Sequence, residues 1–210
     1  MTAQTTPRRG PGRPRDPNAD AAILRAAVDL LIERGIDQTS MEGIAKRAGV
    51  AKVTVYKRWR SKEDLLADAI EKARDDIPGV APVRAASELP KLLETLLPRW
   101  GEALADPRYR ALSARLLGAG SNHPALLEAY WKHHVLPRRE RSRALLRRAQ
   151  DEGVLDPTSD IDVLLDMMAG AIIHRLVLEP GEPSPEEIGR YLRRLFRQAG
   201  LAQFTEQPTA

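Results

Sequence analysis

The sequence predicts an all-α protein, in which an N-terminal helix-turn-helix domain of three helices is followed by a larger helical domain. Composition is the first reason: Ala, Leu and Arg dominate the 210 residues, and aromatic residues make up only 4%. The second reason is periodicity, because apolar residues recur at helical spacing over most of the chain from residue 20 onward. The third is that no alternating apolar and polar pattern of useful length, as strands require, occurs in the sequence.

The first two helices are bounded by clear start and stop signals. Residues 1–18 hold four prolines, two glycines and four arginines, which predicts a flexible arm ahead of the first helix. That helix runs from Asp20 to about Arg34, because Gly35 suits the left-handed position that ends a helix. Thr39 and Ser40 are candidate N-caps of a second helix over residues 41–48, and Thr39 with Glu42 fits a capping box.

Two further short helices complete the N-terminal region. The turn Gly49-Val50-Ala51 leads into a third helix over residues 52–59, with Val55 and Trp59 facing inward. Ala51 offers no side-chain cap, which costs about 1 kcal/mol and predicts a frayed start in the absence of a partner. A fourth helix begins at Ser61 and extends to about residue 75. Two short helices joined by a three-residue turn that contains Gly form a helix-turn-helix.

The second region begins after the proline- and glycine-containing stretch 76–87. Helical patterns are predicted at about 88–105, 107–119, 124–151, 159–178 and 185–199. Pro98 and Pro137 lie inside two of them and are expected to kink or split those helices. We therefore divide the chain into an arm (1–18), a helix-turn-helix domain (19–77), a helical domain (78–203) and a disordered tail (204–210).

Composition and charge narrow the class of protein. The chain lacks cysteine, which excludes disulfides, thiolate zinc sites and cysteine catalysis. It has no apolar leader and no run of 18 apolar residues, so we expect no membrane span and a cytoplasmic location. Residues 1–62 carry 13 Lys/Arg and six Asp/Glu, whereas the remainder carries 20 and 23. Positive charge concentrated in the first third indicates a polyanionic partner such as DNA.

A family resemblance follows from residues 36–66, IDQTSMEGIAKRAGVAKVTVYKRWRSKEDLL. The short helix, the Ala-Gly-Val turn, Thr54-x-Tyr56 and the later Ser61-Lys62-Glu63 resemble the DNA-binding signature of the TetR (tetracycline-repressor-like) family. The resemblance implies a transcriptional regulator, specifically a repressor, that binds a palindromic operator in double-stranded DNA as a homodimer. It also implies a C-terminal domain for dimerisation and for binding a small-molecule effector.

The resemblance assigns DNA-binding roles by position. Base edges would be approached by Lys52, Val53 and Lys57, and Tyr56 would meet a base methyl group or a phosphate. Phosphates would be held by Thr54, Arg58 and Lys62, while Ser40 would present the start of the second helix to the backbone. The residue types agree with these roles, because a recognition helix needs exposed hydrogen-bond donors on one face and a buried face behind it. For Tyr56 and Trp59 the alternative is simple core packing, which we accept for Trp59 only.

The arm offers a second mode of DNA binding. Gly12-Arg13-Pro14-Arg15 resembles the Gly-Arg-Pro core of AT-hook segments, in which Arg13 and Arg15 would enter a narrow A·T minor groove. The alternative is an ordinary basic tail, since the match is short and Asp16 follows it.

The second region contains candidates for a ligand site and for a dimer interface. Bulky or polarizable groups at Trp100, Tyr109, Trp131, Met167 and His174 suit a mainly apolar ligand with a polar end, although each is also compatible with an ordinary core. His174-Arg175 lies in an apolar run, where a buried cation needs a partner such as a carboxylate. For the dimer, the predicted apolar stripes of the last two helices are Ile161, Leu164, Leu165, Met168 and Ile172, then Ile188, Tyr191, Leu192, Leu195 and Phe196.

Other readings of the sequence remain. The arginine run 138–148 is expected to be a solvated, ion-paired helix face rather than a second nucleic-acid site. No nucleophile elbow, phosphate loop or metal-spaced cluster is present, so neither an enzyme nor a cofactor is expected. The alternatives to a regulator are a sequence-tolerant architectural DNA-binding protein without ligand control and a helical enzyme that uses His174.

Overall fold

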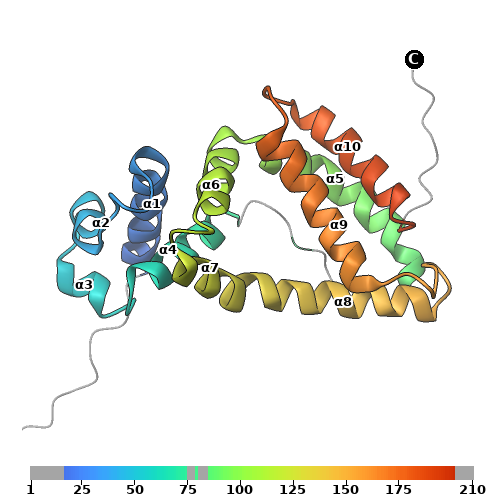
Figure 1. Cartoon of the computed structure of the whole chain (residues 1–210), viewed down its shortest axis with the longest axis horizontal. Coiled ribbons are helices and arrows are strands. Elements are labelled where there is room, and N and C mark those ends of the chain that lie inside the picture. The colour runs from blue at the N-terminus through green and yellow to red at the C-terminus, as the bar shows by residue number, and fades with distance from the viewer. Residues whose placement is uncertain (1–16, 75–78, 80–84, 202–210) are drawn as a thin grey trace, which may run out of the picture.

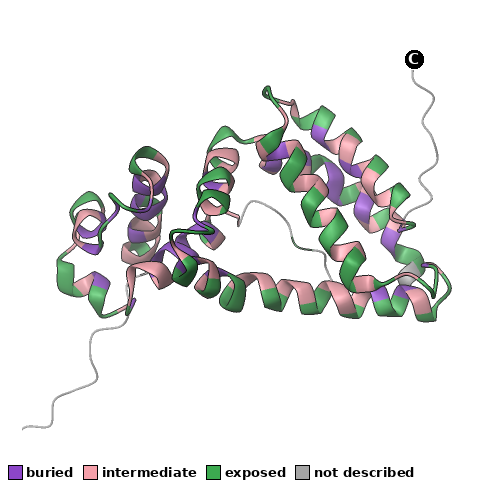
Figure 2. Cartoon of the chain, in the orientation of Figure 1, coloured by how far each residue is buried: buried purple, intermediate pink, exposed green. Residues whose placement is uncertain are grey.

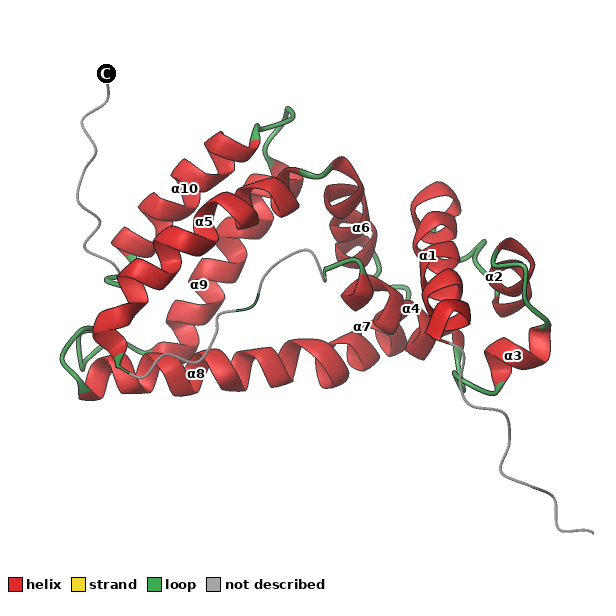
Figure 3. Ribbon diagram, turned by 180° about the vertical axis from the view of Figure 1, so that it is seen from behind, coloured by secondary structure: helices red, strands yellow, loops and turns green. Residues whose placement is uncertain are grey.

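The computed structural model describes residues 17–74, 79 and 85–201, and within them it contains helices and no strand (Figures 1 and 3). The N-terminal helices are α1 (Pro17–Arg34), α2 (Met41–Arg47), α3 (Lys52–Tyr56) and α4 (Lys62–Lys72). A short 3-10 turn, Ala86–Glu88, precedes α5 (Leu89–Ala105), α6 (Pro107–Gly118) and α7 (Pro124–Tyr130). The remaining helices are α8 (Leu136–Asp151), α9 (Ile161–Ile173) and α10 (Pro185–Gln198). The all-α class is confirmed.

The molecule is elongated, with α1, α2 and α3 at one end and the pair α5 and α10 at the other (Figure 1). The head, which we define as α1–α4, has its own core of fully buried aliphatic side chains. These include Ile23, Leu31, Ile44, Leu65 and Leu66. Residues of α6 and α7, such as Leu112 and Leu126, pack on the same core, so the head continues directly into the second region. Figure 2 shows the buried residues gathered on the inner faces of these helices.

The stop predicted for α1 is confirmed, and the capping box predicted for α2 is wrong. Gly35 has φ +77° directly after Arg34, and Ile36 is buried behind it. Ser40, not Thr39, caps α2, with its Oγ accepting a hydrogen bond from the Gly43 amide at 3.0 Å. Thr39 is buried, and its hydroxyl donates to the Gly35 carbonyl at 2.7 Å. The Thr39 hydroxyl therefore bonds to a carbonyl at the end of α1 and not to an amide at the start of α2.

The third helix is shorter than predicted, because it ends at Tyr56 rather than at residue 59. The amides of Arg58 and Trp59 both donate to the Val55 carbonyl, at 2.9 and 3.0 Å, and this tight last turn terminates the helix. Ser61 then caps α4 through a hydrogen bond from the Asp64 amide at 3.0 Å, as its position in the sequence predicts.

Two π-type turns interrupt the helical pattern of the second region. The first, Trp131–Val135, joins α7 to α8 in one long helix (Figure 1), and Pro137 follows it at the start of α8. Because proline has no amide hydrogen, a widened turn ahead of it agrees with the irregularity predicted there. The second, His174–Leu178, extends α9. Pro98 does not split α5, which continues to Ala105.

A second core joins α5, α8, α9 and α10. Its fully buried members include Leu89, Leu97, Ile188 and Leu192. The backbones of α5 and α10 approach closely at Gly101, where an added Cβ would lie 2.3 Å from the Pro185 carbonyl oxygen. Glycine is therefore required at this crossing.

The outward face of α9 differs from the predicted dimer stripe. The predicted residues Ile161, Leu164, Leu165, Met168 and Ile172 pack against the second core. The exposed apolar side chains are instead Val163 (53% exposed), Met167 (64%), Ile173 and Leu178. No residue of α9 is fully buried in the single chain, although 13 residues of mostly apolar character form it. A second apolar face of this helix is thus left uncovered.

Candidate DNA-binding surface

The turn between α2 and α3 presents α3 at the end of the head (Figure 1). Gly49 adopts φ +68°, a left-handed conformation that side chains other than hydrogen disfavour. The Val50 amide closes the turn by donating to the Ala45 carbonyl at 3.0 Å. Ala51 makes no side-chain cap, as the sequence predicts.

The five residues of α3 separate into an exposed front and a buried back. Val53 is 56% exposed and Tyr56 is 50% exposed, and Lys52 and Lys57 are exposed beside them. Val55 is fully buried in the head core. Tyr56 is therefore not a core residue. An aliphatic and an aromatic side chain held in water between two lysines form a surface suited to base edges and phosphates.

Trp59 packs in the core, as expected, and its polar atom has a specific partner. The indole Nε1 donates to Oδ2 of Asp68 on α4 at 2.8 Å. The other carboxylate oxygen, Oδ1, lies 3.1 Å from His134 Nε2 in the π-type turn between α7 and α8. Asp68 thus connects the end of the α3 segment to the second region. Neither partner is evident from sequence, because they lie 9 and 66 residues from Asp68.

Two residues predicted to hold phosphates have partners inside the head. The Arg58 guanidinium pairs with Asp20 of α1 and donates to the Thr54 carbonyl at 2.9 Å, with only 14% of its side chain exposed. Lys62 donates from Nζ to the Ile36 carbonyl at 3.1 Å. A phosphate contact by either residue would compete with these bonds, and both contacts stay predictions.

The other predicted DNA-binding residues are placed as follows. Ser40 is exposed at the start of α2, and Thr54 is half-buried on α3. Arg13 and Arg15 lie outside the described residues.

A carboxylate that the sequence analysis assigned to a capping box lies at the front of this surface. Glu42, on the first turn of α2, accepts a hydrogen bond from the Tyr56 hydroxyl through Oε1 at 2.7 Å. Lys52 Nζ lies 3.7 Å from the same oxygen. The hydrogen bond from Tyr56 lowers the pKa of the Glu42 carboxyl, and it raises the pKa of the Tyr56 hydroxyl.

The five candidate ligand residues lie in different surroundings. Trp100 packs against Phe196 with ring centroids 5.6 Å apart. Tyr109 accepts a hydrogen bond from Arg74 at 2.7 Å, and burial raises its pKa. Trp131, Met167 and His174 are exposed instead. The outward faces of α9 and of the π-type turns carry these three residues, so in a single chain they face solvent.

Two open hollows of the second region are lined by residues other than those five. One, of about 230 Å³, is lined by Arg175, Glu179, Pro180, Glu182, Pro183 and Glu187. A tight apolar one is lined by Leu104, Ile172, Arg175, Leu176, Ile188, Tyr191 and Leu192. Arg175 borders both, pairs with Glu179 four residues later, and lies over the Tyr191 ring at 5.6 Å. The carboxylate partner expected for a buried cation is thus supplied by the chain itself.

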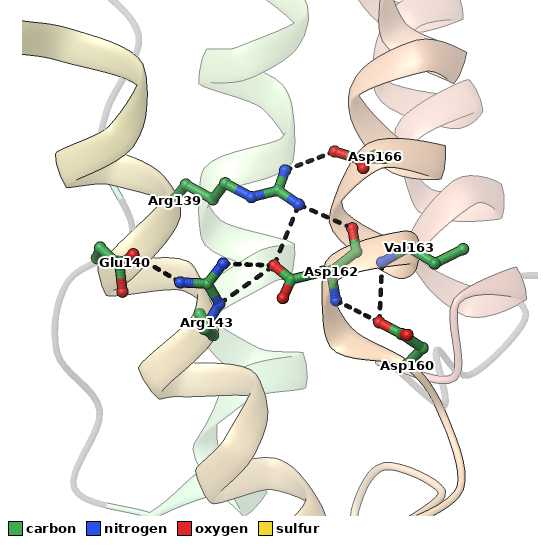
Figure 4. Close-up of polar contacts among 7 residues, drawn as sticks. All are labelled: Arg139, Glu140, Arg143, Asp160, Asp162, Val163 and Asp166. Carbon is green, nitrogen blue, oxygen red and sulfur yellow. Dashed lines mark hydrogen bonds and ion pairs between the residues drawn. The ribbon is translucent and has the colours of Figure 1, made fainter. Parts of the chain in front are cut away.

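The arginine run of α8 is an ion-paired face, as predicted (Figure 4). Arg143 donates to Asp162 at 2.6 Å and to Glu140 at 2.6 Å. Arg139 donates to Asp166 at 2.5 Å and to Asp162 at 3.1 Å. These bonds fix the start of α9 against α8. A hydrogen bond from Arg143 is the largest cause of the lowered pKa of Asp162.

Among the described residues, no group of three His, Cys, Asp or Glu side chains is arranged to hold a metal ion. None of the helices in the described ranges has the length and apolar character needed to cross a bilayer.

Comparisons with known proteins agree with this architecture in both regions of the chain. Residues 23–69 match the family model for bacterial regulatory proteins of the tetR family, and residues 88–195 match the tetracyclin repressor-like C-terminal domain. The HTH-type transcriptional regulator YdeS of Bacillus subtilis is 31% identical over 93% of this chain and 96% of its own length.

Two further relatives extend the comparison. The DNA-binding transcriptional repressor TetR of Mycobacteroides abscessus is 28% identical over 75% of this chain and 82% of its own. A crystal structure of a TetR-family regulator from Mesorhizobium loti superposes with a TM-score of 0.62 at 21% identity, covering 88% of this chain and 96% of that one. This last likeness concerns the fold.

Proposed function

Because the chain belongs to the tetR family of bacterial regulatory proteins, it is a DNA-binding transcriptional regulator and not an enzyme, and we propose that it is a repressor released from its operator by a small molecule. Regulators of this family bind operator DNA and act as dimers. The proposal places the DNA-binding domain at residues 19–77, the regulatory domain at 78–203 and the protein in the cytoplasm, where its DNA lies.

The exposed front of α3 is the observation that carries the proposal. The helix presents Lys52, Val53 and Tyr56 to water, Lys57 is exposed directly after it, and Val55 is fully buried behind them. Exposure of large apolar side chains costs free energy unless a partner covers them. The major groove offers such a partner, with base acceptors for the lysines and thymine methyl groups for the apolar contacts. Ser40 and Thr54 would then lie near phosphates.

The uncovered face of α9 supports assembly through the regulatory domain. Val163 and Met167 are more than half exposed, and the ion pairs of α8 with Asp162 and Asp166 hold α9 so that these two side chains point outward. A second copy related by a two-fold axis would cover the same face on both chains. We expect light scattering to give about twice the chain mass of 23.3 kDa, and a monomeric mass at micromolar concentration would contradict the assignment.

Ligand control is supported by the contacts between the head and the regulatory domain. Asp68 joins Trp59 to His134 across this boundary, and Arg138 of α8 pairs with Glu71 of α4. A ligand that favours one arrangement of these contacts would change the position of α3. The proposed ligand residues remain Trp100, Tyr109, Trp131, Met167 and His174, of which Trp100 and Tyr109 are partly enclosed in the single chain.

The test compares operator DNA with a scrambled duplex. Sequences bound by the purified protein are selected from a random library, and binding is then measured at several salt concentrations. A repressor of this class prefers its operator by at least about 1,000-fold and protects two half-sites. Similar affinity for operator and scrambled DNA would favour the architectural alternative.

Ligand control is tested by thermal shift. A ligand at 100 times its Kd stabilises the fold by about 2.7 kcal/mol, and it must also release operator DNA. A stabilising ligand that leaves operator binding unchanged would contradict the proposed control.

A further inference from the structure

Glu42 places a negative charge on a surface whose other exposed groups suit a polyanion. Its side chain is 44% exposed, and its Oε1 atom is shared between the Tyr56 hydroxyl at 2.7 Å and the Lys52 ammonium group at 3.7 Å. Glu42 lies on α2, whereas both partners lie on α3, 10 and 14 residues further along the chain. One carboxylate oxygen thus joins the two helices of the helix-turn-helix at their exposed side.

This arrangement has two opposite consequences for DNA binding. The carboxylate repels nearby phosphates and neutralises Lys52, which lowers the affinity for any duplex. It also fixes the direction of the Tyr56 side chain, because the hydroxyl donates to a partner held by a different helix. Fixing a contact residue before binding reduces the entropy lost in a complex that needs that one orientation.

We propose that Glu42 is a specificity-determining residue, which holds Lys52 and Tyr56 in the free protein and so suppresses binding to non-operator DNA more than binding to the operator. The inference rests on the proposed DNA-reading role of α3. In a non-operator complex the contacts are mainly with phosphates. The repulsion by Glu42 and the neutralised charge of Lys52 therefore both lower the affinity for non-operator DNA. At the operator, base contacts by Lys52 and the ordered Tyr56 compensate for the charge.

The expected change in DNA affinity on removal of the Glu42 charge follows from counterion release. A Lys52 side chain freed from Glu42 can neutralise one more phosphate, which steepens the slope of log K against log salt by about 0.9. At 0.15 M salt this corresponds to roughly fivefold tighter binding to scrambled DNA. The affinity for the operator should change less, because there Lys52 is already engaged with bases.

The experiment measures binding of operator and scrambled duplexes between 0.05 and about 0.3 M salt by fluorescence anisotropy. The test variant is Glu42→Gln, which keeps an oxygen that accepts from Tyr56 but removes the charge. Glu102→Gln is the matched control, because it makes the same charge change at an exposed position of α5, outside the head. Circular dichroism and thermal unfolding establish that each variant is folded.

The inference predicts that Glu42→Gln binds scrambled DNA roughly fivefold more tightly with the steeper slope, that Glu102→Gln changes neither, and that the operator preference falls in Glu42→Gln alone. The steeper slope must vanish when Glu42→Gln is combined with Lys52→Ala, a dependence that a purely structural role of Glu42 would not produce, whereas the smaller gain from lost phosphate repulsion remains. An unchanged slope in Glu42→Gln, or a slope that stays steeper without Lys52, overturns the inference. If instead the unaltered protein prefers no sequence over scrambled DNA, the proposed function itself fails.

Discussion

Gly101 is the position at which a single methyl group should disturb the regulatory domain most directly. A Cβ at this position would lie 2.3 Å from the carbonyl oxygen of Pro185 and 3.2 Å from its carbonyl carbon. Both atoms belong to the backbone at the start of α10, so no side chain can rotate away. Ordinary contact begins at 3.4 Å, and α10 must therefore move by about 1 Å in Gly101→Ala.

The cost of that movement exceeds the gain from a better helix former. Overpacking costs about 1–3 kcal/mol, and the shift also loosens the contacts of Leu97, Ile188 and Leu192, which are buried along α5 and α10. Alanine is favoured over glycine in a helix by about 1 kcal/mol, which opposes these losses. We expect the free energy of unfolding to fall by a net amount of up to about 2 kcal/mol, with about 2–4 °C in Tm for each kcal/mol at this chain length.

The assay is thermal unfolding followed by circular dichroism at several protein concentrations, because dimerisation contributes to the measured stability. The control is Gly118→Ala in α6, where an added Cβ meets nothing within 4 Å. That variant should be as stable as the unaltered protein or more stable. If Gly101→Ala unfolded at the same temperature as Gly118→Ala, the close approach of α5 and α10 would not limit the packing.

The remaining predictions concern DNA binding and the ion pairs. Lys57→Ala should cost about 1–3 kcal/mol of operator affinity and change the sequence preference, whereas Lys62→Ala should weaken all sequences alike; equal behaviour in gel shifts across operator variants would contradict this division. Deleting residues 1–16, which precede α1, should leave Tm unchanged and reduce affinity most at sites flanked by A·T pairs, while equal loss at G·C-flanked sites would leave only a general electrostatic arm. Trp59→Phe keeps an aromatic side chain but removes the donor to Asp68 and leaves a smaller ring in the core, so the free energy of unfolding should fall by more than the roughly 0.5–1.5 kcal/mol of the hydrogen bond alone; an unchanged Tm would contradict the role of this contact. The pKa of Asp162 is lowered in the folded protein, so its ionised carboxylate stabilises the fold at neutral pH. This contribution is lost as the pH falls through the folded pKa, which lies below 3.8. The Tm difference between the unaltered protein and Asp162→Asn should disappear there, and a constant difference would contradict the role of this ion pair.

Local signals were sufficient to predict the head. Helix ends and turns are set by residues that act on the adjacent backbone, as Gly35, Gly49 and Ser61 do. Their effects can therefore be predicted from a short stretch of sequence. Thr39 was misassigned because its hydroxyl can satisfy either the helix before it or the helix after it. The choice depends on which side is buried, and only the packed structure decides that.

Contacts between distant residues were not predictable in the same way. The partners of Arg58 and Lys62 lie 38 and 26 residues away. The sequence does not show whether an Arg or Lys side chain points to solvent or pairs with a distant group inside the fold. On α9 the difficulty is different, since residues such as Leu164, Met167 and Met168 make the helix apolar on nearly every side. Periodicity separates an inward from an outward face only when the two differ in polarity.

The position of α6 shows how the segment after α9 is connected to the head. Arg110 of α6 donates to the carbonyls of Leu176 and Gly181, at 3.0 and 2.6 Å, where α9 ends and the turn to α10 begins. Further along the same helix, Arg115 donates to the Ile32 carbonyl of α1 at 3.1 Å. Twelve helical residues span about 18 Å and move as one unit, so a displacement at the end of α9 reaches α1 and the core behind α3. A ligand under the proposed control therefore need not contact the head, since a difference in its affinity for two positions of α6 is sufficient to shift the spacing of the two DNA-binding surfaces in a dimer.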